Sequence, residues 1–165
     1  MGRYRPPTAP SSKYITPVGK DKLQQEHDYL WREKRPQVTR SVQEAAAQGD
    51  RSENAEYIYG KKQLREIDYR VRYLRKRLAD MTVVDAIPEE QDRVFFGAWV
   101  SLEDEAGESN EYRIVGPDEF DDADEYISMD APLAKALLKR RLHDEIVVQL
   151  PQGEKHYFIS AIRYQ

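Results

Sequence analysis

A seven-residue repeat of apolar side chains between residues 57 and 81 is the feature that most limits how this chain can fold. Its apolar positions lie three and four residues apart, as in a coiled-coil seam, and Gly60 occupies one of them. The members are Tyr57, Leu64, Ile67, Val71, Leu74, Leu78 and Met81. The repeat predicts a long helix from Glu53 to Asp80, and a second helix must cover its apolar stripe.

The preceding segment is the nearest candidate for that second helix. From about Thr16 its apolar residues recur at helical spacing, first Leu23, His27 and Leu30, then a shifted stripe of Trp31, Val38, Val42 and Ala45. Pro36 interrupts this pattern, and an interior proline removes one backbone hydrogen bond, so a bend or two stacked segments are expected there. Because the connection is short, the two helices should form an antiparallel hairpin with its tip near residues 48–54.

Two carboxylates, Asp50 and Glu53, lie at this expected tip. Asp50 or Ser52 could cap the second helix, and Gly49 suits the position that closes the first. The alternative is a metal ligand, although one Asp and one Glu cannot satisfy the six oxygen ligands of Mg²⁺. On spacing alone, capping is the favoured interpretation.

Charge is distributed unevenly along the chain. Residues 1–80 hold 18 Lys or Arg and 11 Asp or Glu, a balance of +7, whereas residues 81–165 hold 8 and 19, a balance of −11. The second helix carries eight cations between residues 60 and 79 but only Glu66 and Asp68 as anions. An external polyanion is therefore expected along this helix, while the acidic half argues against tight binding to free nucleic acid.

The second half of the sequence predicts an α+β domain. Strands are expected at residues 93–102, 111–115, 124–129, 144–150 and 156–164, mostly antiparallel, with a linker or first strand at 82–92. A short helix is expected at residues 131–141, with Asp130 as its cap and Pro132 in its first turn.

Several classes of protein are disfavoured by composition. The chain has no cysteine, which excludes disulfides and thiol chemistry, and its three histidines are scattered. No apolar run is long enough to span a membrane, and the first residues lack the apolar core of a signal peptide. The proline-containing residues 1–13 are expected to be a disordered leader.

The segment "GDRSENAEYIYGKKQLREIDYRVRYLRKRL" closely resembles the hairpin of bacterial Gre transcript cleavage factors, a family of transcription elongation factors, and in particular their GreB type. The similarity continues through "YLWREKRPQV", "VFFGAWVSLED", "YRIVGPDEF" and "YISMDAPLAKALLK", and so covers the chain from about Tyr14 to its end. It implies an antiparallel coiled-coil hairpin over residues 14–82, followed by a domain over residues 83–165 with the fold of FKBP prolyl isomerases.

The resemblance also implies a function. Such factors insert the coiled coil into the secondary channel of RNA polymerase and stimulate its own cleavage of backtracked nascent RNA. Asp50 and Glu53 match the family's two essential tip carboxylates, which would share Mg²⁺ with the polymerase active site. The protein would be a DNA-binding, cytoplasmic monomer without membrane contact, an activator and not itself an enzyme.

Further residues match by position. Lys61, Lys62 and Arg65 correspond to a basic patch that contacts the extruded RNA, Asp130 and Pro132 to the segment that docks on polymerase, and Ser52 and Asn54 to tip-supporting positions. Two features depart from the family pattern, namely the leader, to which we assign no function, and Gly60, which would loosen the tip.

Three other functions stay open from the residues. The first is a polymerase-channel regulator that does not stimulate cleavage, which would be expected to lack the tip carboxylates. The second is prolyl isomerisation, which needs a concave apolar pocket that Trp99, Tyr112, Tyr126 and Phe158 could line. The third is binding of free RNA, which the acidic half disfavours.

Overall fold

The computed structural model describes residues 10–165, and these divide into two units. Residues 18–81 form a helical unit, whereas the described residues before 18 join residues 82–165 in a globular unit. The division differs from the expected boundaries at both ends of the hairpin, because residues 14–17 and Thr82 belong with the globular unit. Most of the expected leader, residues 1–9, lies outside the described residues.

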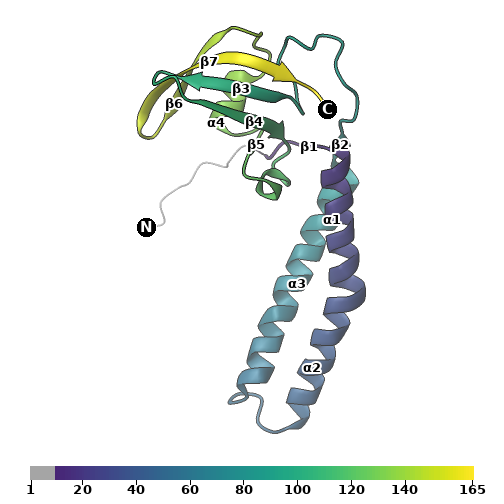
Figure 1. Cartoon of the computed structure of the whole chain (residues 1–165). Coiled ribbons are helices and arrows are strands. Elements are labelled where there is room, and N and C mark those ends of the chain that lie inside the picture. The colour runs from purple at the N-terminus through teal and green to yellow at the C-terminus, as the bar shows by residue number, and fades with distance from the viewer. Residues whose placement is uncertain (1–9) are drawn as a thin grey trace. The chain divides into compact units, whose positions relative to one another are not determined.

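The helical unit is the expected antiparallel hairpin (Figure 1). One side consists of α1 (Pro17–Tyr29), a π-helical turn (Leu30–Lys34) and α2 (Arg35–Ala47), and the other is α3 (Ala55–Asp80). The apolar seam of α3 faces α2 and α1, with Ile67, Val71 and Leu74 buried. Burial of this stripe, at about 25 cal/mol per Å² of apolar surface, is what stabilises helices whose outer faces are so highly charged.

The interruption expected near Pro36 takes the form of the π turn that precedes it. Arg35 donates its backbone N–H to the carbonyl oxygen of Leu30, five residues back, so the turn contains one extra residue. The extra residue explains why the buried positions Leu30 and Val38 are eight apart and not seven. The expectation that Trp31 joins the seam is wrong: its side chain is 42% exposed and lies 4.4 Å below the Arg75 guanidinium.

Gly60 permits close contact between the helices. A Cβ atom at this position would lie 2.6 Å from Cγ2 of Val42, well inside van der Waals contact. The glycine therefore lets α3 approach α2 closely, and the structure gives it a packing role that its low helix propensity alone does not suggest.

The globular unit contains two sheets. A two-stranded parallel sheet pairs β1 (Tyr14–Ile15) with β2 (Thr82–Val83). The main sheet has the order β5-β4-β3-β7-β6 and a helix, α4 (Pro132–Leu137), on one face (Figure 1). Its strands are β3 (Trp99–Asp104), β4 (Ser109–Val115), β5 (Tyr126–Ser128), β6 (Glu145–Leu150) and β7 (Gly153–Arg163), and a 3₁₀ turn (Phe120–Asp122) precedes β5.

The expectation of a mostly antiparallel sheet is confirmed, since β4 and β5 run parallel and the other three strand pairs of the main sheet are antiparallel. Two other expectations for this unit need correction. The strand expected from residue 93 begins only at Trp99, since Ala98 donates its N–H to the carbonyl of Phe95 and closes a turn. Asp130 does not cap α4, whose N-cap is Ala131 without a side-chain hydrogen bond.

The core of the globular unit lies between α4 and the sheet. Alternate residues of β3 and β6 point inward, and they pack on Ala134 and Leu137 of the helix. The fully or almost fully buried members are Val94, Ala98, Val100, Leu102, Ile114, Ala134, Leu137, Ile146, Val148 and Ile159. This alternation of inward apolar and outward polar residues is what made the strands recognisable in the sequence.

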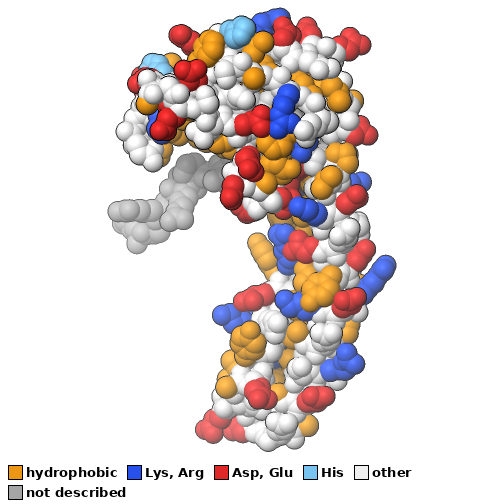
Figure 2. Space-filling model, viewed as in Figure 1, with side chains coloured by type: hydrophobic (Ala, Val, Ile, Leu, Met, Phe, Trp, Pro, Cys, Tyr) orange, Lys and Arg blue, Asp and Glu red, His pale blue; other side chains and the backbone are white. Residues whose placement is uncertain are grey.

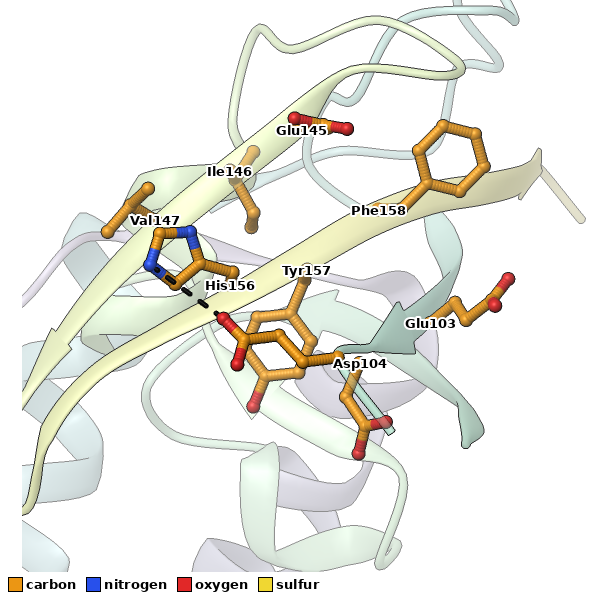
Figure 3. Close-up of a pocket in the computed structure, with 9 residues that line it drawn as sticks. Glu103, Asp104, Glu145, Ile146, Val147, His156, Tyr157 and Phe158 are labelled. Carbon is orange, nitrogen blue, oxygen red and sulfur yellow. Dashed lines mark ion pairs between the residues drawn. The ribbon is translucent and has the colours of Figure 1, made fainter. Parts of the chain in front are cut away.

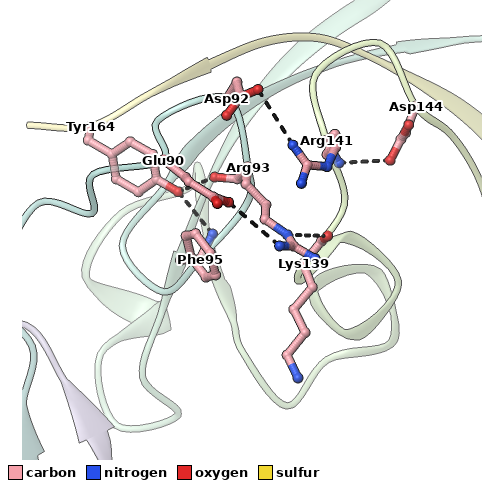
Figure 4. A network of polar contacts seen from close by, with 8 residues as sticks. All are labelled: Glu90, Asp92, Arg93, Phe95, Lys139, Arg141, Asp144 and Tyr164. Carbon is pink, nitrogen blue, oxygen red and sulfur yellow. Dashed lines mark hydrogen bonds and ion pairs between the residues drawn. The ribbon is translucent and has the colours of Figure 1, made fainter.

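Polar contacts hold the segment after β2 onto this unit (Figure 4). The Tyr164 hydroxyl accepts a 2.9 Å hydrogen bond from the Phe95 N–H and donates to the Arg93 carbonyl. Arg93 in turn donates to the carbonyl of Lys139 at 3.0 Å and pairs with Glu90 at 3.6 Å. A segment with little secondary structure is thereby tied to the loop after α4 and to the end of β7.

A buried carboxyl group anchors β1. Glu119 is only 2% exposed, and its two oxygens accept hydrogen bonds from the backbone N–H of Thr16 at 2.8 Å and from its hydroxyl at 2.6 Å. Burial raises the pKa of Glu119, although the hydrogen bonds from Thr16 oppose that shift. The contact holds the strand that leads into α1 against the globular unit.

Candidate functional site

One side chain, that of Asn54, organises the hairpin turn. Asn54 is the N-cap of α3, and its Oδ1 accepts a hydrogen bond from the Tyr57 N–H at 3.1 Å. Its Nδ2 donates to the carbonyl oxygen of Ala45, near the end of α2, at 2.7 Å. Gly49, with φ at +144°, follows the end of α2 and lets the chain turn away. One amide therefore satisfies a backbone group at each of the two helix ends.

Asp50 is held by its neighbour Ser52. The Oδ1 atom of Asp50 accepts hydrogen bonds from the backbone N–H of Ser52 at 2.9 Å and from its hydroxyl at 2.8 Å. These hydrogen bonds lower the pKa of Asp50, because they stabilise the charged carboxylate. The side chain is exposed and does not cap α3, so the capping interpretation of Asp50 and Ser52 is wrong.

Glu53 is exposed at the same turn, immediately before the cap residue. Acidic side chains gather at the free end of the hairpin (Figure 2). Within residues 10–165 no three acidic or histidine side chains come together as a metal site. The tip thus offers two carboxylates, enough for part of a magnesium coordination sphere but too few to hold the ion alone.

The cations of α3 divide into engaged and free groups. Arg70 makes a two-pronged ion pair with Glu26 of α1 at 2.8 and 2.9 Å, and Asp68 pairs with Arg35 of α2 at 2.7 Å. Counting charges on α3 alone missed both partners but not the balance, because the opposite side of the hairpin supplies an acid to Arg70 and a base to Asp68. In contrast, Lys61, Lys62 and Arg65 are exposed and form no ion pair within the described part of the chain.

The two residues expected to dock on a partner lie at the start of α4. Pro132 is exposed, whereas Asp130 is half-buried. The carboxylate of Asp130 accepts hydrogen bonds from the backbone N–H of Ser12, at 2.9 Å, and from its hydroxyl. The last part of the expected leader is therefore attached to the same segment as Pro132.

The aromatic residues considered for a prolyl isomerase pocket do not share one cavity. A cavity of about 400 Å³ lies over β3, β6 and β7, but of the four aromatics only Phe158 lines it (Figure 3). Much of the remaining lining is acidic: it includes Glu103 and Glu145, both opposite Phe158 in the sheet, and Glu105, which lies 3.8 Å from His156. Trp99 instead packs edge-on against Tyr126, at 6.0 Å between ring centroids. The structure offers no support for the isomerase alternative.

No helix within residues 10–165 is both long and apolar enough to cross a membrane.

Comparison with known families now identifies both parts. Residues 13–83 match the family model "Transcription elongation factor, N-terminal", and residues 89–164 match "Transcription elongation factor, GreA/GreB, C-term". An N-terminal helical hairpin with acidic residues at its turn, followed by a sheet domain, is thus the arrangement of a bacterial transcription elongation factor. The chain belongs to the GreA/GreB family of these factors.

Curated relatives are similar to this chain over nearly its whole length. Transcription elongation factor GreB of Pseudomonas aeruginosa is 57% identical over 99% of this chain and 98% of its own length. The GreB of Yersinia pestis is also 57% identical, over 93% of this chain and 90% of its own. A solved structure of the transcription factor Gfh1 is 26% identical, covers 94% of this chain and 99% of its own, and has a TM-score of 0.44.

Sequence reasoning missed the role of Asn54 as the cap. The signal was present, since an Asn directly before a helical repeat is as strong a cap as Asp or Ser. It was overlooked because the more conspicuous Asp50 and Ser52 stand only a few residues earlier.

Proposed function

We propose that this protein stimulates the endonucleolytic cleavage of backtracked RNA by RNA polymerase, and that Asp50 and Glu53 act inside the polymerase active site. The observation that supports the proposal is the tip itself: two exposed carboxylates at the end of a hairpin, neither used as a helix cap. A narrow hairpin can enter a channel that would exclude the globular unit.

The two carboxylates suit a shared active site. A Mg²⁺ ion supplied with the polymerase would stabilise the charge that develops during phosphodiester hydrolysis. Asp50 remains ionised because Ser52 lowers its pKa, and its Oδ2 atom is not used by these hydrogen bonds, so it can serve as an oxygen ligand. Glu53 is exposed at the same turn, three residues after Asp50, and would orient the attacking water or accept its proton.

The remaining residues divide the other tasks. The free cations Lys61, Lys62 and Arg65 would hold the phosphate backbone of the extruded RNA through charge attraction. The segment around Asp130 and Pro132 would dock the globular unit on the polymerase. The chain is then an activator of polymerase chemistry and does not hydrolyse RNA alone.

A transcript assay tests this proposal. The protein is added to a stalled, backtracked polymerase complex with Mg²⁺, and the RNA is examined for shortening. Shortened transcripts that can be extended again support a cleavage factor. Inhibition of extension without shortening would instead identify the channel regulator, and no effect on polymerase would refute both.

A further inference from the structure

A cavity on one flank of the hairpin, close to its tip, has no part in the function proposed above. It measures about 370 Å³ and lies between α2 and α3. The missing side chain of Gly60 forms part of its floor, together with Val38 and Ala45. Its outer lining is Ser41, Glu44, Gln48, Glu56, Tyr59 and Gln63. We call this set the flank groove.

The flank groove combines an aromatic wall with acidic groups. Tyr59 is 67% exposed, unusually high for a large side chain beside a helix–helix contact. Glu44 and Glu56 are exposed, and within the described residues neither forms an ion pair. No lysine or arginine lines the groove. The hollow therefore presents negative charge and an open ring face, and lacks an internal cation to neutralise them.

Two of the three free cations near the tip, Lys61 and Arg65, lie on a different side of α3 from the groove. A residue advances about 100° around a helix, so Tyr59 and Lys61 point in nearly opposite directions. Arg65 follows Lys61 four residues later on the same side as Lys61. Lys62, three residues after Tyr59, lies on the same side of α3 as Tyr59, so of these cations Lys61 and Arg65 face away from the free carboxylates of the groove.

This arrangement decides which kind of ligand suits the groove. A phosphate chain would be repelled by Glu44 and Glu56, whereas a guanidinium group would be attracted by both. An arginine can lie flat on a tyrosine ring while its N–H groups bind carboxylates, and the groove offers these two partners together. Charge complementarity therefore favours an arginine side chain of a protein over a nucleotide.

We propose that the flank groove binds an arginine side chain of RNA polymerase and so fixes which way the hairpin faces inside the channel. The inference rests on the proposed function, because that function brings the hairpin into the polymerase. With the acidic flank held by protein, the opposite flank with Lys61 and Arg65 is left for RNA.

Affinity for RNA polymerase core enzyme without nucleic acid tests the inference, because RNA cannot contribute there. Glu44→Lys should weaken binding at least tenfold, and Tyr59→Ala about threefold to tenfold. The matched controls are Glu33→Lys, about three helical turns away on the same side of the hairpin, and Tyr69→Ala, 70% exposed on α3 but outside the groove. Both controls should change affinity less than twofold.

Equal affinities for groove and control variants would overturn the inference. So would a loss confined to backtracked complexes, which would assign the groove to RNA. Helical circular dichroism at matched concentration confirms that every variant folds. Stimulation of polymerase cleavage by the unsubstituted protein is measured separately. A protein that binds through the groove but stimulates no cleavage would refute the proposed function and leave the inference about the groove standing.

Discussion

The side-chain amide of Asn54 donates a hydrogen bond to the carbonyl oxygen of Ala45, across the turn that separates α2 from α3. Because the same side chain caps α3, the two helix ends are joined through one residue. The positions of Asp50 and Glu53 depend on this link, since both belong to the loop that it closes.

Asn54→Ala should destabilise the hairpin by roughly 1 to 3 kcal/mol, from the lost cap and the lost hydrogen bond to Ala45. Asn54→Asp separates the two effects, because it keeps the cap acceptor but places an oxygen against the Ala45 carbonyl. Thermal unfolding followed by circular dichroism should show that the parent is the most stable protein, Asn54→Asp the next and Asn54→Ala the least stable. An Asp variant as stable as the parent would show that the link to Ala45 contributes nothing.

Gly60→Ala should also destabilise the hairpin, although alanine is the better helix former. The new Cβ would overlap Val42, at a cost of about 1 to 3 kcal/mol that exceeds the gain of about 1 kcal/mol in helix propensity. In a Val42→Ala background the overlapping methyl is gone, so the same substitution should become neutral or stabilising. Urea unfolding of the four chains measures this coupling, and additive effects would contradict the packing role of Gly60.

Glu119 should give the globular unit a dependence of stability on pH. Its pKa is raised by burial above the ordinary value of 4.5, so the folded state binds a proton more tightly than the unfolded state. The resulting stabilisation is complete below about pH 4.5 and is lost as the pH rises through the raised pKa. Glu119→Gln imitates the protonated form, because its amide can donate to the Thr16 hydroxyl while its oxygen accepts from the Thr16 N–H.

Calorimetric melting of Glu119→Gln and the parent chain from pH 4 to pH 8 checks this expectation. The advantage of the Gln variant should grow with pH and level off above the raised pKa. Glu119→Ala should be less stable than both at every pH, since it leaves the buried N–H of Thr16 without an acceptor. A difference between Gln and parent that stays constant with pH would mean that Glu119 does not titrate in this range.

The tip carboxylates can be tested with substitutions that preserve shape. Asp50→Asn and Glu53→Gln should each reduce stimulated cleavage by roughly 100-fold or more, a typical scale for losing a positioned acid or base. Both side chains are exposed, so folding and polymerase affinity should remain close to those of the parent. Cleavage rates at saturating protein measure the first effect and competition binding the second. Full stimulation by both variants would exclude a shared site.

The parts of this structure that could be predicted from the sequence are those encoded by a repeat. The seven-residue seam of α3 specified the antiparallel hairpin, and alternation specified most strands. The sequence did not predict the π turn. One inserted residue before Pro36 shifts the helical spacing of the apolar residues, and this shift was interpreted as a second apolar stripe that includes Trp31. The pairing of Arg70 with Glu26 was missed because it joins residues 44 positions apart. The tip residues were found through resemblance, whereas the flank groove depends on how α2 and α3 meet at Gly60.

The free cations near the tip should matter most when much RNA has been extruded. Replacing Lys61 and Lys62 by Glu reverses the charge at two exposed positions without breaking an ion pair in the described structure. Long extruded RNAs present more phosphates than short ones, so stimulated cleavage should fall much more for complexes backtracked by many nucleotides than for those backtracked by two. The matched control reverses Arg140 and Lys155, two exposed cations of the globular unit, and should preserve the length profile. Cleavage rates over a series of defined backtracked complexes measure the profile. An equal loss at every RNA length would argue that these lysines contact polymerase and not the extruded strand.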